Sequence, residues 1–425
     1  MRAIYFLLIF LILLSLLQNH SIYAQRYHPL AKLWKVDDTE VPEYLGLEKN
    51  LTAIDEILRP ILEQDDFISS FGGTFINIFE NHIVINTVNY SKVDDLLALP
   101  QIKPHEAFLY FKKANNSMNL LKHNFDKISF ITQIIHPKKV LIYIDMRYNN
   151  VVLYFLGHNI NNTEFIDAVK SFNPTIIYEG SSPGSQNIIR PQHEYDSDNS
   201  ITIKALGGDG LYNSAKSAAC SLGFWATNKF HPDELYIITA GHCYNDTDPQ
   251  NNFYLLPWNS TLSNLPFLGS MVFDFIEIYD FGVIHVVDKD VSPSFVIRND
   301  DTDQYKELPI IDGAPVSSHG VHICKSGYSS RFTCGYVLGL NGIYAVEDGF
   351  TVTWELIITS MYGKYGDSGG SVFSFASPQD LNLVVVHGII ITVGLASCSA
   401  QSIDTIFNQL RENTFYDLIL YLGGS

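Results

Sequence analysis

The sequence predicts a mainly β protein preceded by an N-terminal α+β region. Short apolar runs recur after residue 203, among them 235–238, 283–287 and 371–375, and such runs are typical of strands. The region before residue 203 has no cysteine and carries a hairpin-and-helix pattern twice, whereas all five cysteines follow residue 219. At 425 residues the chain exceeds the size of one hydrophobic core, so we expect more than one domain.

Residues 1–24 have the features of a targeting segment. Arg2 supplies a positive charge, the apolar run 4–17 is short for a membrane span, and Ala24 ends a cleavage motif before Gln25. We therefore expect cleavage at this point and secretion to the extracellular space. The alternative is an uncleaved anchor helix.

Residues 25–202 contain a divergent repeat. The runs 73–78 and 83–86 predict one β-hairpin, and the runs 140–144 and 151–155 predict another. A short helix is expected after each hairpin, and in the second helix Phe165, Ile166, Val169 and Phe172 share one face. The polar stretch 191–200 predicts an exposed linker, with a mature chain that begins near residues 203–206.

Three short segments carry chemically complementary side chains in the order His, Asp, Ser. His242 lies in a Thr-Ala-Gly-His-Cys run, Asp280 precedes an apolar run, and Ser368 lies in a Gly-Asp-Ser-Gly-Gly run. A serine hydroxyl needs a base to take its proton as it attacks, and a histidine can do so when a carboxylate fixes its tautomer. Each segment alone is more often an ordinary loop. Their conjunction favours a site with Ser368 as nucleophile, His242 as base and Asp280 as the carboxylate.

Glycines surround the expected nucleophile. They let the backbone turn sharply, so that the amides of Gly366 and Ser368 can face the oxygen that becomes negative when the hydroxyl attacks a carbonyl. We expect these two N–H groups to form an oxyanion hole.

These motifs resemble the chymotrypsin superfamily of serine proteases, and within it alpha-lytic protease and the streptogrisins. The run 206–212 followed by 220–224 is similar to the start of a mature streptogrisin, and the resemblance covers about residues 203–412. It implies two six-stranded antiparallel β-barrels with a C-terminal helix for residues 203–425. It also implies that residues 25–202 are a pro-region that assists folding and blocks the active site until it is cut away. The alternative for residues 25–202 is an unrelated binding domain.

The resemblance also implies two disulfides, which agree with export. These are Cys220–Cys243 and Cys324–Cys334, the second in a Cys-Lys-Ser-Gly loop that is similar to one in the relatives. Cys398 is left over, because Tyr362 stands where the relatives have its partner. We expect Cys398 to be either a buried free thiol or the site of an intermolecular bond.

An ion pair between Asp367 and Lys325 is a further expectation. In the family branch an internal arginine pairs with the matching aspartate, and Lys325 occupies that place here. A buried carboxylate needs such a partner. The alternative is a solvated surface lysine.

The segments that would form the specificity pocket differ from those of the relatives. The segment 360–365 has no aspartate at the position of the trypsin-like pocket charge, so cleavage after Lys or Arg is disfavoured. The strand 387–394 is bulky where relatives have small residues, and the pocket is therefore either narrowed or obstructed. The tail 402–422 is predicted to be a helix whose apolar face packs on the barrel through Ile403, Ile406, Phe407 and Leu410.

Composition excludes several other functions. A net charge of −18 argues against nucleic acid as a partner. The run 207–210 lacks the lysine of a phosphate loop, and no metal-binding motif is present, so we expect neither a metal nor a cofactor.

Asn-x-Ser/Thr acceptors for glycosylation occur at Asn50, Asn89, Asn115, Asn161, Asn245 and Asn259.

Two functional classes stay open. The first is an active secreted serine endopeptidase, made as a zymogen, that acts on proteins and peptides through an acyl-enzyme, with its own pro-region as partner. We expect it to be a monomer with no membrane contact after signal cleavage. The second is a catalytically silent homologue that acts as a secreted binding protein. The intact set of three residues favours the first class.

Overall fold

The computed structural model describes residues 28–157, 160–180, 203–244, 251–260, 262–299 and 305–423. The predicted signal segment and the predicted linker lie outside these residues. The chain divides into two compact units, residues 1–41 and 42–425. In the first unit the described elements are α2 (Pro29–Trp34) and η1 (Asp38–Glu40). Of the helices described, none is both long enough and apolar enough to cross a membrane.

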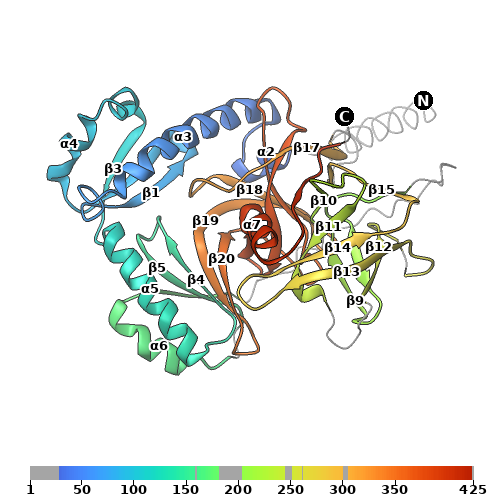
Figure 1. Cartoon of the computed structure of the whole chain (residues 1–425). Coiled ribbons are helices and arrows are strands. Elements are labelled where there is room, and N and C mark those ends of the chain that lie inside the picture. The colour runs from blue at the N-terminus through green and yellow to red at the C-terminus, as the bar shows by residue number, and fades with distance from the viewer. Residues whose placement is uncertain are drawn as a thin grey trace, which may run out of the picture. The chain divides into compact units, whose positions relative to one another are not determined.

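The two hairpins predicted before residue 203 are confirmed, and each belongs to a larger repeated unit (Figure 1). A long helix precedes each hairpin, and a short helix and a third strand follow it. The third strand pairs in parallel with the second strand of the hairpin. The first repeat comprises α3 (Val41–Leu62), β1 (Phe71–Asn77), η2 (Ile78–Glu80), β2 (His82–Thr87), η3 (Tyr90–Lys92), α4 (Val93–Leu97), η4 (Lys103–Phe108) and β3 (Leu109–Lys113). The second comprises α5 (Met118–Ile135), β4 (Val140–Asp145), β5 (Asn150–Phe155), α6 (Thr163–Val169), η5 (Lys170–Phe172) and β6 (Thr175–Tyr178).

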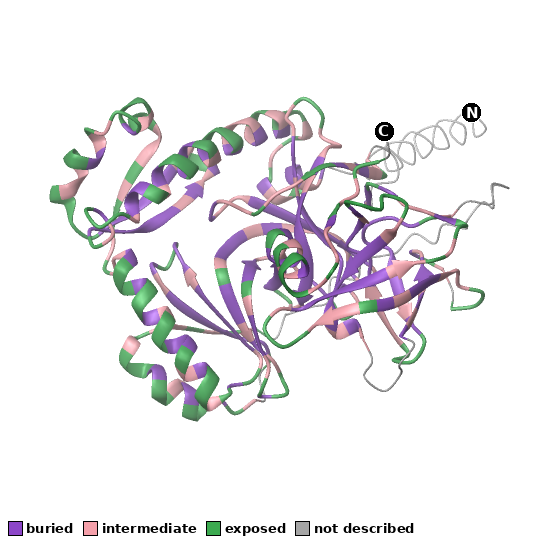
Figure 2. Cartoon of the chain, in the orientation of Figure 1, coloured by how far each residue is buried: buried purple, intermediate pink, exposed green. Residues whose placement is uncertain are grey.

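Local chemistry accounts for the turns and for the packing of these units. The hairpin turns contain Asn81 and Asn149, both with positive φ, which asparagine tolerates better than most residues. In the second repeat, Phe165 and Val169 of α6 are buried in one hydrophobic cluster with residues of β4 and β5. The outer sides of α5 and α6 are exposed (Figure 2). The predicted apolar face of the second short helix is therefore confirmed.

Strands from residue 210 onward build the first barrel sheet. Its order is β24-β10-β11-β14-β13-β12-β8-β9. Backbone hydrogen bonds from Gly208 N to Leu222 O (2.7 Å) and from Leu222 N to Asp209 O (2.8 Å) join the segments that lead into β8 and β10. The strands are β8 (Gly210–Asn213), β9 (Ala218–Ser221), β10 (Phe224–Asn228), β11 (Leu235–Thr239), β12 (Asn252–Leu256), β13 (Phe267–Phe275), β14 (Phe281–Val286) and β24 (Leu418–Leu420).

Six further strands close a second barrel. Each pairs antiparallel with the next in the order β18-β19-β20-β23-β22-β21, and β21 pairs with β18. The strands are β18 (His322–Gly327), β19 (Arg331–Ala345), β20 (Val352–Thr359), β21 (Ser371–Phe375), β22 (Val384–Thr392) and β23 (Cys398–Ser402). Short strands β7 (Ile203–Lys204), β15 (Val291–Ser292), β16 (Val296–Arg298) and β17 (Glu307–Gly313) lie outside this ring. The prediction of a mainly β fold with two barrels is confirmed.

The second N-terminal repeat and the second barrel share one sheet, whereas β1, β2 and β3 of the first repeat form a separate three-stranded sheet. The end of β19 pairs antiparallel with β4, with Ile343 opposite Ile142 and Ala345 opposite Val140. The strands β4, β5 and β6 thus extend the barrel sheet outward (Figure 1).

The C-terminal helix is shorter than predicted. Helix α7 spans Ile403–Asn413, and its buried face includes Ile406 and Leu410 as expected. The ring of Phe407 meets that of Phe224 edge-on at 5.9 Å. The prediction of helix up to residue 422 is wrong, because β24 pairs with the open edge of β10. Tertiary pairing outweighs local helix propensity there.

Candidate active site

The loop 366–370 requires glycine at two positions. Gly366 and Gly369 have φ of +99° and +82°, a region that side chains rarely adopt. A Cβ on Gly369 would lie 2.1 Å from Thr239 Oγ1, so the first barrel approaches the loop too closely for any side chain. The loop conformation thus depends on the freedom of glycine to adopt positive φ and on close contact between the barrels.

The amides of this loop divide into two groups. Those of Asp367, Gly369 and Gly370 donate to carbonyl oxygens at 2.7–3.0 Å. The amides of Gly366 and Ser368 donate to no other group in the part of the chain that the structure describes. These two N–H groups are the ones expected to bind an oxyanion, and they are available for a ligand.

His242 and Asp280 are held together by two hydrogen bonds. His242 lies in η6 (Gly241–Cys243) after β11, and Asp280 directly precedes β14, which pairs with β11. His242 Nδ1 lies 2.6 Å from Asp280 Oδ2, and the His242 backbone amide donates to Oδ1 at 3.0 Å. Since the carboxylate accepts, Nδ1 carries the proton and Nε2 is left as the basic atom.

Electrostatics favour the charged form of His242. Burial opposes the imidazolium, but the charge of Asp280 and its hydrogen bond outweigh burial and hold the pKa of His242 above its usual value of about 6.5. The charge of Lys216 acts in the opposite direction and lowers the same pKa. The site thus stabilises the imidazolium that would form when the histidine takes a proton.

His242 and Ser368 line one pocket of about 180 Å³. No hydrogen bond joins them within the described residues, and such bonds are often long in sites without substrate. Asp280 is not among the residues that line this pocket, and it is connected to the pocket only by its hydrogen bond to His242. The other lining residues are Lys216, Ala218, Ala219, Cys220, Cys243, Tyr365 and Gly366.

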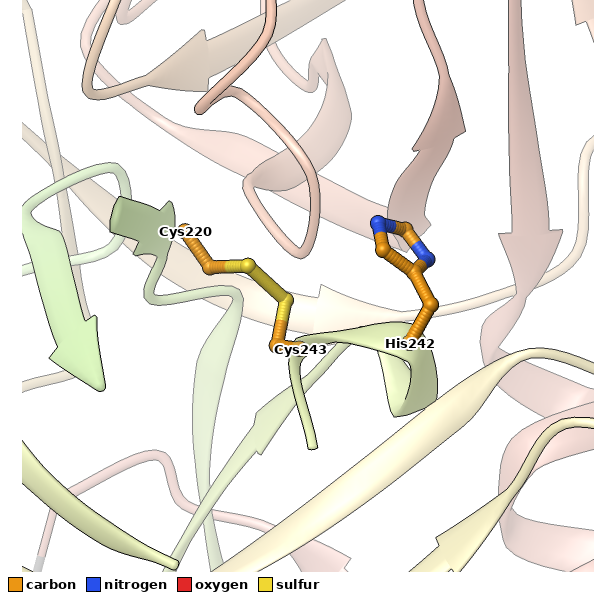
Figure 3. A group of neighbouring side chains, drawn as sticks. All are labelled: Cys220, His242 and Cys243. Carbon is orange, nitrogen blue, oxygen red and sulfur yellow. A yellow bond between two sulfur atoms is a disulfide. The ribbon is translucent and has the colours of Figure 1, made fainter. Parts of the chain in front are cut away.

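A disulfide forms the pocket wall next to His242. Cys220 and Cys243 are bonded, and Cys243 follows His242 on the same short helix (Figure 3). The three residues have metal-ligand chemistry and lie close together. Because both sulfur atoms are in the disulfide, neither is a thiolate that could bind a metal ion. The second disulfide joins Cys324 to Cys334 across β18 and β19.

Lys325 and Asp367 form a fully buried ion pair, with Nζ 3.0 Å from Oδ2. Asp367 also accepts hydrogen bonds from three backbone amides at 2.8–2.9 Å and from the hydroxyl of Ser330. Burial opposes the carboxylate, but the charge of Lys325 and the hydrogen bond from Ser330 hold the pKa of Asp367 below its usual value. Asp367, which lies in sequence between Gly366 and Ser368, is therefore held by one ion pair and four hydrogen bonds.

Sequence reasoning missed two supporting residues. Ser221 donates from its hydroxyl to Gly366 O and from its amide to Ser368 O, both at 2.7 Å. Gln401 of β23 accepts a hydrogen bond from the Asp280 amide at 3.2 Å. The contacts of Ser221 and Gln401 join segments that are far apart in sequence. The only sequence feature that could have indicated either residue is the position of Ser221 directly after Cys220, in the run 220–224.

The two segments expected to form a specificity pocket touch each other. Gly363 N donates to Gly394 O at 3.0 Å, and a Cβ on Gly363 would lie 2.8 Å from both Val393 Cγ1 and Cys398 Sγ. Cys398 is a buried free thiol, and burial raises its pKa to about 11. Its burial agrees with the first of the two alternatives for this residue and argues against an intermolecular bond.

Solved structures similar to this chain are chymotrypsin-like serine proteases. A Nocardiopsis protease is 17% identical with a TM-score of 0.39, and covers 51% of this chain and 99% of its own. Protease A of Thermobifida fusca is 17% identical with a TM-score of 0.39, and covers 52% and 100%. A glutamic acid specific serine protease is 23% identical with a TM-score of 0.40, and covers 51% and 100%. No family model and no curated protein matches the chain.

Proposed function

We propose that this chain, whose barrels have the chymotrypsin-like fold, is a secreted serine endopeptidase made as an inactive precursor. The observation that carries the proposal is the geometry of one pocket. His242, hydrogen-bonded to Asp280, lines it together with Ser368, and the amides of Gly366 and Ser368 donate to no other group among the described residues. These are the parts that acyl transfer to a serine requires.

The reaction follows from these positions. The Ser368 hydroxyl attacks the peptide carbonyl carbon while His242 Nε2 takes its proton, and the carbonyl oxygen becomes negative. The amides of Gly366 and Ser368 stabilise that oxygen, and each such donor is typically worth about 10²- to 10³-fold in rate. The C–N bond then breaks as His242 gives its proton to the leaving amine. Water repeats the sequence on the acyl-enzyme and regenerates the serine.

Residues 25–202 are proposed to be the pro-region of the precursor, and the structure describes residues 28–157 and 160–180 of it. Three contacts with the protease portion support this proposal. The strand β4 extends the sheet of the second barrel through β19. Glu48 of α3 pairs with the ring of His322, and both are buried. Asp55 of α3 is fully buried and accepts a hydrogen bond from Ser318 at 2.7 Å.

The last described residues before the linker support a role in blocking the site. Glu179 follows β6, and its Oε1 accepts a hydrogen bond from the Leu395 amide at 2.5 Å. Leu395 follows the strand β22 and the segment that contacts Gly363. A pro-region anchored beside this segment would hinder substrate until the chain between residues 180 and 203 is cut.

A catalytically silent binding protein is the second candidate, and one observation favours it. The contact between Gly363 and Gly394 brings together the two segments that would hold a substrate side chain. A site without room for substrate would leave the three residues without function.

Labelling by a fluorophosphonate distinguishes the two candidates. We expect the processed, secreted protein to be labelled and the Ser368→Ala variant to be unlabelled. The probe reports an activated serine and needs no deep side-chain pocket. Absence of labelling in a folded, processed protein would reject the peptidase and favour the binding protein.

A further inference from the structure

We infer that the protein prefers substrates with an acidic side chain directly after the cleaved bond, and that Lys216 recognises that side chain. The inference rests on the proposed peptidase function and names its substrate class. Lys216 lines the pocket that also contains His242 and Ser368. It was not among the residues predicted from the sequence.

The chemistry of the reaction decides which part of the substrate lies in this pocket. His242 returns its proton to the leaving amine, so that amine must lie at the His242 side of Ser368. The Cys220–Cys243 disulfide, which lies near the His242 ring (Figure 3), and Lys216 line the same pocket as His242. The residue after the cleaved bond therefore enters the pocket that Lys216 lines.

The charge of Lys216 is available to a ligand. Its Nζ donates to two carbonyl oxygens, His242 O at 2.5 Å and Tyr244 O at 3.3 Å, which hold the side chain in place. An ammonium group has three donors, so one remains for a further partner. Within the described residues Lys216 forms no ion pair. A substrate carboxylate would supply a counter-charge.

The rest of the pocket favours a short acidic side chain. Ala218, Ala219 and the disulfide form a largely apolar wall, which leaves Lys216 as the charged group to be satisfied. The segments at Gly363 and Gly394, which are expected to hold the side chain before the cleaved bond, are in contact and leave little room for a large side chain. Selection among substrates therefore depends mainly on the residue directly after the cleaved bond.

Matched peptides test the inference. Internally quenched peptides would differ only in Asp, Asn or Lys after the cleaved bond, with the bond confirmed by mass spectrometry. For the processed wild-type protein we expect kcat/KM to be about three- to fivefold higher for Asp than for Asn, the size of one partly exposed ion pair. The preference should shrink at high salt, because salt screens an exposed pair.

Two lysine variants complete the test. Lys216→Gln should lower the Asp-to-Asn ratio to about one, whereas Lys229→Gln, an exposed lysine of the same barrel outside the pocket, should leave it unchanged. Fluorophosphonate labelling, which involves no residue after the cleaved bond, reports the proposed function separately. If the wild type is labelled but its ratio is one, or if Lys216→Gln keeps the wild-type ratio, the inference is wrong while the peptidase stands. If the wild type is not labelled, both fail.

Discussion

Replacing Lys325 by methionine should destabilise the protein and weaken catalysis together. The substitution removes the charge and keeps most of the side-chain length, so Asp367 becomes a buried carboxylate without a cation. Breaking a buried pair in this way typically costs about 3–5 kcal/mol. Asp367 keeps three backbone donors and the Ser330 hydroxyl, so we expect the lower end, about 3 kcal/mol.

The catalytic effect follows from the position of Asp367 between the two oxyanion amides. Loss of its anchor should misplace the N–H groups of Gly366 and Ser368, and kcat/KM should fall by about 10²-fold, the typical value of one oxyanion donor. The pH dependence of stability should change as well. The folded pKa of Asp367 lies below its unfolded value of about 3.9, so this stabilisation exists above that value and is lost as the pH falls through the folded pKa. Without Lys325 the loss should begin at higher pH.

Urea unfolding of the processed protein measures the stability change, with each variant made in a Ser368→Ala background to prevent self-digestion. The double variant Lys325→Met/Asp367→Asn is the control, because it removes both charges and should recover part of the lost stability. The reasoning is refuted if Lys325→Met alone changes the free energy of unfolding by less than about 0.5 kcal/mol and leaves kcat/KM unchanged.

Further predictions concern the base, the loop brace, the pro-region and the pocket. In pH–rate profiles, the kcat/KM of the wild type should rise with pH as His242 loses its proton, with a midpoint above about pH 6.5. Asp280→Asn should lower kcat by about 10³- to 10⁴-fold, and it should lower the midpoint because the charge that raises the pKa of His242 is lost. Ser221→Ala should cost about 1–2 kcal/mol in urea unfolding, because the loop loses a hydroxyl hydrogen bond. Glu48→Ala should speed release of the cut pro-region on size-exclusion chromatography, because a buried histidine of β18 loses its partner; release at the wild-type rate would contradict that role. Val393→Gly should remove the side chain that lies beside Gly363 and increase cleavage after large apolar residues in a peptide library, and an unchanged profile would show that this side chain does not limit the pocket.

The sequence predicted those features that depend on local pattern. The order of His242, Asp280 and Ser368, the glycine-rich loop and the two hairpins each follow from a short run of residues with one chemical or periodic requirement. In the structure His242 and Ser368 line one pocket, and Asp280 lies outside its lining and is hydrogen-bonded to His242.

The features that the sequence did not predict depend on contacts between distant segments. The strand β24 forms because an edge of β10 is open, although the residues alone favoured a longer helix. Ser221 braces the loop across a sequence separation of 145 residues, and β4 joins β19 from the N-terminal region. Such pairings depend on tertiary position, which local propensity and periodicity do not encode.

The central claim is that His242, held by Asp280, makes Ser368 nucleophilic. The most direct test is the rate at which a fluorophosphonate modifies the processed protein, with the adduct located by tandem mass spectrometry, in the wild type and in His242→Ala. We predict a single adduct on Ser368 whose rate of formation falls by at least about 10³-fold in the variant. An adduct on another residue, or equal rates in the two proteins, would contradict the claim.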